Sequence, residues 1–162
     1  MSEREMFIQR WEREFQTTLK VLKAYPTAKA SLQPHAKCPD AKGLAWRIVL
    51  EEPLFVNGAL TGNFDFSSMT PAPATIEEVI ATFEKNHAPL VEKVKKASDA
   101  DFAKLVKFFV APKTMGDIRS GDALWTMLLD SIHHRGQFSI YLRMADGKVP
   151  SIYGPSGDEP WM

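Results

Sequence analysis

The feature that most constrains this chain is an apolar stripe between residues 76 and 94. Its members are spaced by alternating steps of four and three residues: Ile76, Ile80, Phe83, His87, Leu90 and Val94. This spacing predicts an amphipathic helix whose stripe is buried against other helices. Thr75, followed three residues later by Glu78, forms a capping box that predicts the start of the helix. Pro89 lies inside the helix and predicts a local kink.

Three other segments carry helical patterns, at about residues 7–25, 40–60 and 117–144. Pro26 ends the first of them, and the Gly and Pro of ADGKVP end the last. Residues 98–117 include the apolar sequence KFFVAP and are predicted to be either a short helix or an extended connector, because strand signals are weak throughout the chain. Four helices joined by long connections predict an all-α fold, an antiparallel four-helix bundle.

Composition narrows the class of protein. A chain of 162 residues, 44% hydrophobic and 25% charged, fits one globular domain spanning residues 1–162. Twenty basic residues balance twenty acidic ones, which argues against a nucleic-acid or an anionic-membrane partner. No apolar run approaches the ~20 residues of a membrane span, and the single cysteine, Cys38, favours a reducing compartment. We therefore expect a soluble, cytoplasmic protein.

The last helix carries the sequence DSIHHRGQFSIYLR, in which two histidines are adjacent. At 100° per residue, His134 lies about 40° from Asp130, whereas His133 lies about −60° and Arg135 about 140° from it. Asp130 and His134 thus share a face at a spacing that can bind one metal ion or one water. The same side also carries Met127, Gln137, Phe138 and Tyr141. His133 and Arg135 are predicted to lie at an edge or an interface.

The other side of this helix is also apolar, with Leu124, Trp125, Leu128 and Ile132. A helix that is apolar on two sides is expected to be covered on two sides. The second side is therefore predicted to face a partner subunit or the C-terminal tail. Gly136 lies on this second side, and a mid-helix glycine predicts the close approach of another backbone.

Polar residues also interrupt the apolar stripes of the second and third helices. His87 is either a hydrogen-bonded core histidine or a ligand, and Arg47 either extends to solvent or pairs with Glu51, four residues later. Buried charges are costly unless they are paired, so these residues and the Asp130–His134 pair are predicted to cluster. A polar pocket in a bundle core is where such proteins bind metal ions and small ligands.

The segments SIHHRGQFSIYLRMADGKVPSIYGPSGDEPW and AKGLAWRIVLEE strongly resemble the last and second helices of the DinB-like family. PHAKCPDAKGLAW and FEKNHAPLVEKV match in placement as well, so the resemblance covers nearly the whole chain. It implies an antiparallel four-helix bundle, commonly a homodimer. It also implies zinc or nickel on three histidines, one from the second helix and two from the fourth. The family's assigned activities are metal-dependent hydrolysis or transfer reactions of low-molecular-weight thiols, and many members have no assigned reaction.

The resemblance transfers to this sequence only in part. His134 matches the last ligand, Asp130 stands where many relatives have histidine, and Arg47 stands at the second-helix position, while His87 borders the expected pocket. Because arginine stays protonated, Arg47 cannot ligate a metal. One hypothesis is therefore a salt-bridged pseudo-metal site in which Arg47 pairs with Asp130 and Glu51. Its rival is a rearranged metal site that uses His134, Asp130 and His87, or Glu51.

Two classes of function follow. The first is a metal-dependent hydrolase or thiol transferase, in which His134, Asp130 and Glu51 are the predicted catalytic residues and Arg47, His87, Gln137 and Tyr141 line the pocket. The second is a bundle that binds a small molecule, a thiol for example, and has lost its metal chemistry. Cys38 lies in a Pro-bounded connector with nothing nearby that marks it as a nucleophile.

Overall fold

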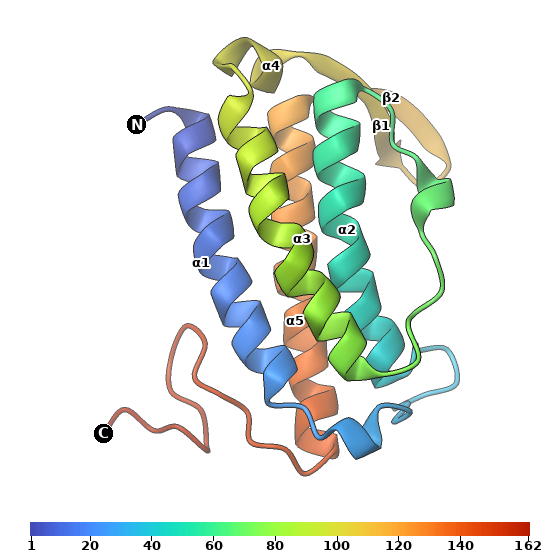
Figure 1. Ribbon diagram of the computed structural model, residues 1–162, viewed down its shortest axis with the longest axis vertical. Coiled ribbons are helices and arrows are strands. Elements are labelled where there is room, and N and C mark those ends of the chain that lie inside the picture. The colour runs from blue at the N-terminus through green and yellow to red at the C-terminus, as the bar shows by residue number, and fades with distance from the viewer.

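Four long helices form the molecule, as a computed structural model that describes all residues 1–162 shows (Figure 1). They are α1 (Glu3–Lys23), α2 (Ala41–Thr61), α3 (Ile76–Lys96) and α5 (Ser120–Met144). In Figure 1, α1 and α5 run in one direction along the bundle, and α2 and α3 run in the other. The prediction of a four-helix bundle is confirmed. None of the helices combines the length and apolar character that crossing a lipid bilayer requires.

The helix boundaries follow from side chains that satisfy the free backbone N–H groups of each first turn. Thr75 and Glu78 form the predicted capping box of α3, and Ser2 forms another with Glu5 at the start of α1. Asp40 accepts a hydrogen bond from the Gly43 backbone and begins α2. α3 continues through Pro89 as one helix. Side-chain caps thus mark the starts of α1, α2 and α3, whereas α5 begins after Arg119 without one.

A layer of polar residues divides the bundle core in two. The helix α2 packs against α3 and α5, and α1 packs against the same two helices. One apolar cluster centres on Phe15, Ile48 and Phe83, and the other on Phe7, Phe55 and Leu124. The buried charged residues lie near the middle of each helix, between these clusters: Glu14, Glu51, Glu52, His87, His134 and Arg135. Of the candidate functional residues, Glu51, His87 and His134 belong to this layer.

The connection between α3 and α5 holds both a short helix and a hairpin. α4 (Asp99–Ala103) precedes β1 (Leu105–Ala111), which pairs antiparallel with β2 (Thr114–Arg119). The expectation of weak strand character is therefore wrong here. The hairpin lies on the outside of the bundle and anchors through Phe108, whose ring lies 5.1 Å from that of Phe55 and 4.5 Å from that of Phe64. Most of its other side chains are exposed, so no polar–apolar alternation marked the strands.

Two further loops join the helices. The connection from α1 to α2 contains the short 3₁₀ helix η1 (Thr27–Lys29), and the crossing from α2 to α3 contains η2 (Phe66–Ser68). The crossing runs along the side of the bundle in Figure 1, which is why α2 and α3 point the same way.

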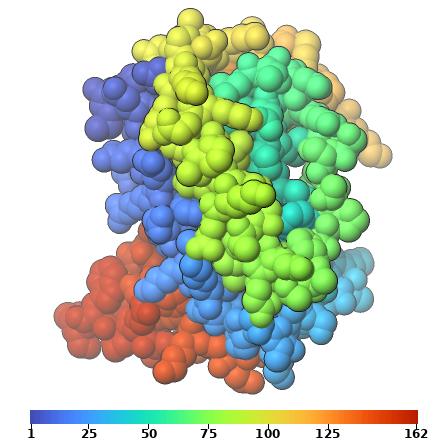
Figure 2. Space-filling view, in the orientation of Figure 1, coloured from blue at the N-terminus to red at the C-terminus, as the bar shows by residue number.

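Arg135 is not at an edge, contrary to the sequence prediction. Its side chain is 2% exposed and donates to the Glu14 carboxylate at 2.7 Å and to the Tyr153 hydroxyl at 2.6 Å. The tail after α5 supplies Tyr153 and so covers the gap between α1 and α5. Figure 2 shows this tail, in red, packed beside α1. The helical angle was right, but the surface that faces Arg135 is another helix of the same chain.

Gly136 is exposed, and a Cβ added to it would meet no atom within 4 Å. The prediction of close backbone packing at Gly136 is therefore wrong within this chain. The helix α5 also exposes Leu129 and Ile140, so its second apolar side is only partly covered by the chain's own segments.

Candidate metal centre

Two consecutive glutamates at the middle of α2 point into different parts of the bundle. Glu51 faces α5, whereas Glu52 faces α1 and α3. Successive residues of a helix differ by about 100°, so adjacent side chains cannot share one site. Both glutamates are buried, with 6% and 3% of their surface exposed. Each must therefore find a partner within the protein.

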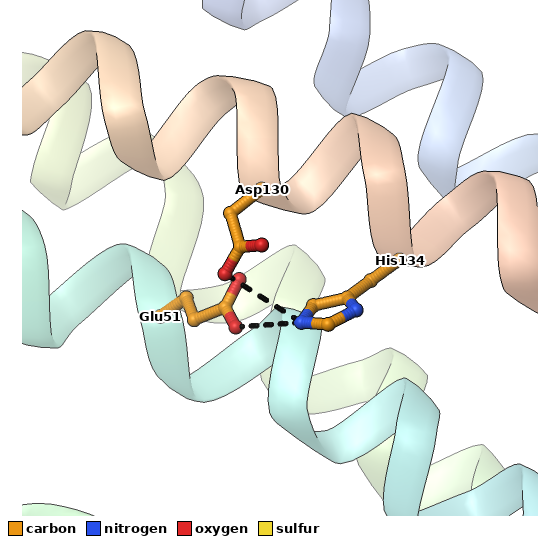
Figure 3. Close-up of side chains that lie close together, drawn as sticks. All are labelled: Glu51, Asp130 and His134. Carbon is orange, nitrogen blue, oxygen red and sulfur yellow. Dashed lines mark ion pairs between the residues drawn. The ribbon is translucent and has the colours of Figure 1, made fainter. Parts of the chain in front are cut away.

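Glu51 meets Asp130 and His134 in a compact cluster (Figure 3). The His134 Nε2 atom lies 3.3 Å from Glu51 Oε1 and 3.5 Å from Asp130 Oδ2. One ligand atom from each residue lies within 4.8 Å of the other two. Asp130 and His134 are one turn apart on α5, as the sequence predicts, and α2 places Glu51 opposite them. Glu51 Oε2 is buried and has no hydrogen-bond partner.

Gln137 links the two adjacent histidines. Its Oε1 lies 3.0 Å from His134 Nδ1, and its Nε2 lies 3.0 Å from His133 Nε2. With the amide nitrogen donating to His133, the Gln137 oxygen accepts from an Nδ1–H of His134. With the ring protonated, Nε2–H donates toward Glu51; with the ring neutral and its proton on Nδ1, the lone pair of Nε2 is free to bind an ion. An outer hydrogen bond of this kind sets the tautomer and the orientation of metal-binding histidines.

The charges of the cluster do not balance. Burial raises the pKa of Glu51, with a further rise from Asp130, while the hydrogen bond from His134 acts in the opposite direction. The hydrogen bond with Glu51 raises the pKa of His134, against the effect of burial. Two carboxylates thus share one imidazole, and with both carboxylates ionised a protonated His134 would still leave one negative charge. A bound cation, or a proton on Glu51, would compensate it.

His87 lies outside this cluster, so its predicted role as a metal ligand beside His134 and Asp130 is corrected. The His87 Nδ1 atom lies 3.3 Å from both oxygens of Glu52, and the ring stacks on Phe15 at a centroid distance of 3.7 Å. Trp11 also donates to Glu52, at 2.6 Å. The alternative expectation, a hydrogen-bonded core histidine, describes what is found. His87 pairs with the second of the two glutamates because α3 packs on the other side of α2.

Arg47 is exposed and forms no ion pair with Asp130 or Glu51, so the hypothesis of a salt-bridged pseudo-metal site is wrong. It precedes Glu51 by one turn, and helical side chains lean toward the N-terminus of their helix. Its guanidinium is therefore carried away from Asp130 and toward Tyr141. Burial raises the pKa of Tyr141, and Arg47 acts against that rise. Arg47, Gln137, Tyr141 and His134 line one cavity of about 410 Å³, as predicted for the first three, whereas His87, which was predicted to line it as well, does not.

Comparison with known proteins establishes the family to which this chain belongs. The model of the DinB family matches residues 1–161. The chain belongs to the DinB family. It is 23% identical over 159 residues to the uncharacterized protein YrdA of Bacillus subtilis, which spans 94% of this chain and 89% of YrdA.

Two solved DinB-like structures share the fold. A protein from Bacillus cereus has a TM-score of 0.78 and 24% identity, covering 92% of this chain and 97% of its own. YjoA of Bacillus subtilis has a TM-score of 0.72 and 15% identity, covering 97% and 99%. At these identities the likeness establishes the architecture of this DinB family member and leaves its chemistry to its own residues.

The donor atoms of this DinB family member fit a divalent ion. Imidazole nitrogen and carboxylate oxygen are both common ligands of such ions, and the buried Glu51 Oε2 has an unused acceptor. The sequence pointed to Asp130 and His134 through their spacing and to Glu51 only as an alternative. It gave no sign that Lys37 and Cys38 line the adjoining cavity, because that depends on how the connector before α2 folds back.

Proposed function

We propose that the protein is a metal-dependent hydrolase or transferase whose divalent ion is held by Glu51, Asp130 and His134. The observation that carries the proposal is the meeting of three donor groups from α2 and α5 within 4.8 Å, with one buried carboxylate oxygen left without a partner. This is the rearranged ligand set in which Glu51, rather than Arg47 or His87, completes the pair on α5. When bound, the ion would supply Lewis acidity and a water of lowered pKa.

The donor set guides the choice of ion. The family resemblance implies zinc or nickel, but two carboxylates and one histidine make an oxygen-rich site. Carboxylate oxygens favour harder ions such as manganese, while zinc accepts histidine and carboxylate together. We therefore propose zinc or manganese, with nickel less favoured than on three histidines.

The protein's own groups have distinct tasks in this proposal. His134 presents Nε2 to the site while Gln137 holds its Nδ1–H at 3.0 Å, and His133 holds the Gln137 amide. Gln137 and His133 are thus positioning residues. Asp130 is half exposed, at 44% of its side chain, and so lies on the solvent side of the cluster. Glu51 forms the buried wall.

The test is metal binding by protein purified without a His tag, stripped with a chelator and titrated with zinc, manganese or nickel in a calorimeter. We expect one ion per chain, and a loss of affinity of about 100-fold in Glu51→Gln. Glu52→Gln is the matched control, because it removes an adjacent buried carboxylate outside the cluster. Failure to bind any of the three ions, or equal affinity in Glu51→Gln and the parent, would refute the proposal.

A metal-free acid–base site is the second candidate, favoured by the 3.3 Å contact between Glu51 Oε1 and His134 Nε2. One proton shared between these atoms could be given to or taken from a substrate. A scaffold without catalysis is the remaining alternative. In both cases a thermal-shift screen against the ions would give no response. A low-molecular-weight thiol as substrate and a homodimeric assembly are proposals that rest on the family resemblance alone.

A further inference from the structure

The cavity beside His134 has a lining that the metal centre does not explain. It measures about 410 Å³ and lies between the connector that precedes α2 and the last turns of α5. Its polar lining comprises Lys37, Cys38, Arg47, His134, Gln137 and Tyr141. Leu44, Ile140 and two prolines complete the wall with apolar surface. A volume of this size suits a small molecule.

The charge of this lining is one-sided. It includes two permanent cations, Lys37 and Arg47, and no carboxylate, although acidic and basic residues balance over the whole chain. Neither cation forms an ion pair, which is also true of most other lysines and arginines of the chain, so the observation that counts is their position at one cavity. Lys37 and Arg47 are both exposed at the cavity and come from different segments, the connector and α2. Two unpaired cations converging on one small cavity favour an anion.

The cavity also adjoins the candidate metal centre. His134 belongs to both, since it lines the cavity and its Nε2 lies near Glu51 and Asp130. A molecule held by Arg47 would therefore reach the cluster at His134, the one member of it that lines the cavity. Arg47, which stands where the family resemblance implies a metal ligand, thus faces the cavity and not the candidate metal centre.

We propose that this cavity binds a small organic anion, a carboxylate or a phosphate on a short apolar body, whose charged group is recognised by Arg47 and Lys37. The inference deepens the proposed function, because it names the class of substrate that reaches Glu51, Asp130 and His134. Arg47 offers a planar fork of donors to the anion, and Lys37 adds a point charge. The apolar body lies against Leu44 and Ile140.

Cys38 provides a direct test, because it is the only cysteine and lies in the wall of the same cavity. Its alkylation by neutral iodoacetamide is followed by mass spectrometry in metal-free protein, with benzoate, phenyl phosphate or uncharged benzyl alcohol as competitor. We expect the two anions to slow alkylation at lower concentrations than benzyl alcohol does. Whichever anion protects at the lower concentration identifies the charged group as carboxylate or phosphate.

Variants tie the protection to the cations. In Arg47→Gln the half-protecting concentration of the better anion should rise about tenfold, and in Lys37→Gln about threefold. Arg10→Gln is the control, since Arg10 is an exposed, unpaired arginine on α1, and it should change the value by less than about twofold. Protection by benzyl alcohol at the same concentration as the anions, absence of protection by both anions, or an unchanged value in Arg47→Gln would overturn the inference.

The same proteins separate this inference from the proposed function. Anion protection is measured without metal, whereas the metal titration is measured without anion. If the unsubstituted protein binds no metal but still shows Arg47-dependent protection, the metal centre is refuted and the anion site is supported. Metal binding with no Arg47-dependent protection would refute the anion site alone.

Discussion

Glu51 and Glu52 are neighbours in the chain and equally buried, yet they belong to different kinds of site. Glu52 accepts a hydrogen bond from Trp11 at 2.6 Å, and His87 lies 3.3 Å from both of its oxygens. Glu51 lies 3.3 Å from His134, but shares that histidine with Asp130 and keeps one buried oxygen without a partner. The first is a completed carboxylate pair, because both oxygens of Glu52 have partners, although His87 Nε2 is buried without a hydrogen bond. The second is a cluster in which two carboxylates share one histidine.

The difference shows that two adjacent glutamates can belong to a structural pair and to a candidate functional site. A buried carboxylate with all its partners stabilises one arrangement of helices, because removing any member leaves another unpaired. A buried carboxylate with an unused oxygen and a second carboxylate beside it is destabilising in the free protein. Such an arrangement is retained where a cation or a proton is needed. We therefore expect a substitution to lower stability much more at Glu52 than at Glu51.

The largest effect should come from Glu52→Ala. It leaves Trp11 Nε1 and the His87 ring buried without their acceptor, and should lower the free energy of unfolding by about 3 kcal/mol. Glu51→Ala is the matched variant and should cost about 1 kcal/mol or less, because relief of a buried negative charge offsets the lost contact with His134. Urea unfolding of metal-free protein measures both. Equal losses in the free energy of unfolding would contradict the distinction between the two glutamates.

Trp11→Phe should have a smaller effect on the same completed pair. The variant keeps an aromatic ring against His87, 4.9 Å away, but removes the Nε1–H that donates to Glu52. We expect a loss of about 2 kcal/mol in the free energy of unfolding, since a hydrogen bond to a buried charged group is lost. Trp125→Phe is the control, because its donation to Glu3 is longer, at 3.3 Å, and partly exposed. A loss at Trp125 as large as at Trp11 would contradict the explanation.

Much of the fold was predictable because helix signals are local. The capping box of Thr75 and Glu78, the stripe around His87 and the stop at Pro26 all act within a few residues. The hairpin at 105–119 was missed because its position depends on the distant Phe55 and Phe64, which hold Phe108. Patterns of exposure arise from such contacts, and they carry no local signature when one element lies on the outside of another.

The site was predictable on one helix and ambiguous across helices. The spacing of Asp130 and His134 placed them together, since the turn of an α-helix is fixed. The choice among Arg47, Glu51 and His87 depended on which helix faces which, and periodicity does not give that. Arg47 and Glu51 share a face of α2 but lie one turn apart. Arg47 therefore lines the cavity, and Glu51 lies beside Asp130. A rotation of 100° then sends Glu52 to His87.

The smallest effect is the pH dependence of the Glu51 cluster. The pKa of His134 is raised above its ordinary value of 6.5, chiefly by its hydrogen bond with Glu51. The folded state thus holds this proton more tightly than the unfolded chain does. The resulting stability is complete below the ordinary value and is lost as the pH rises through the folded pKa. Burial raises the pKa of Glu51 too, which contributes with the same sign at lower pH.

Metal-free protein should therefore lose more stability than His134→Gln as the pH rises from the ordinary value of 6.5 through the raised pKa of His134, as measured by urea unfolding at each pH. Metal affinity should change in the opposite direction and rise over the same range, because His134 must release its proton before Nε2 can bind an ion. Both changes depend on the same proton of His134: its loss lowers the stability of the metal-free protein and raises the affinity for metal. A metal-free stability that falls equally in the parent and in His134→Gln would assign the pH dependence to other groups. The proton on His134 Nε2 would then not be what distinguishes the cluster of Glu51, Asp130 and His134 from the completed pair at Glu52.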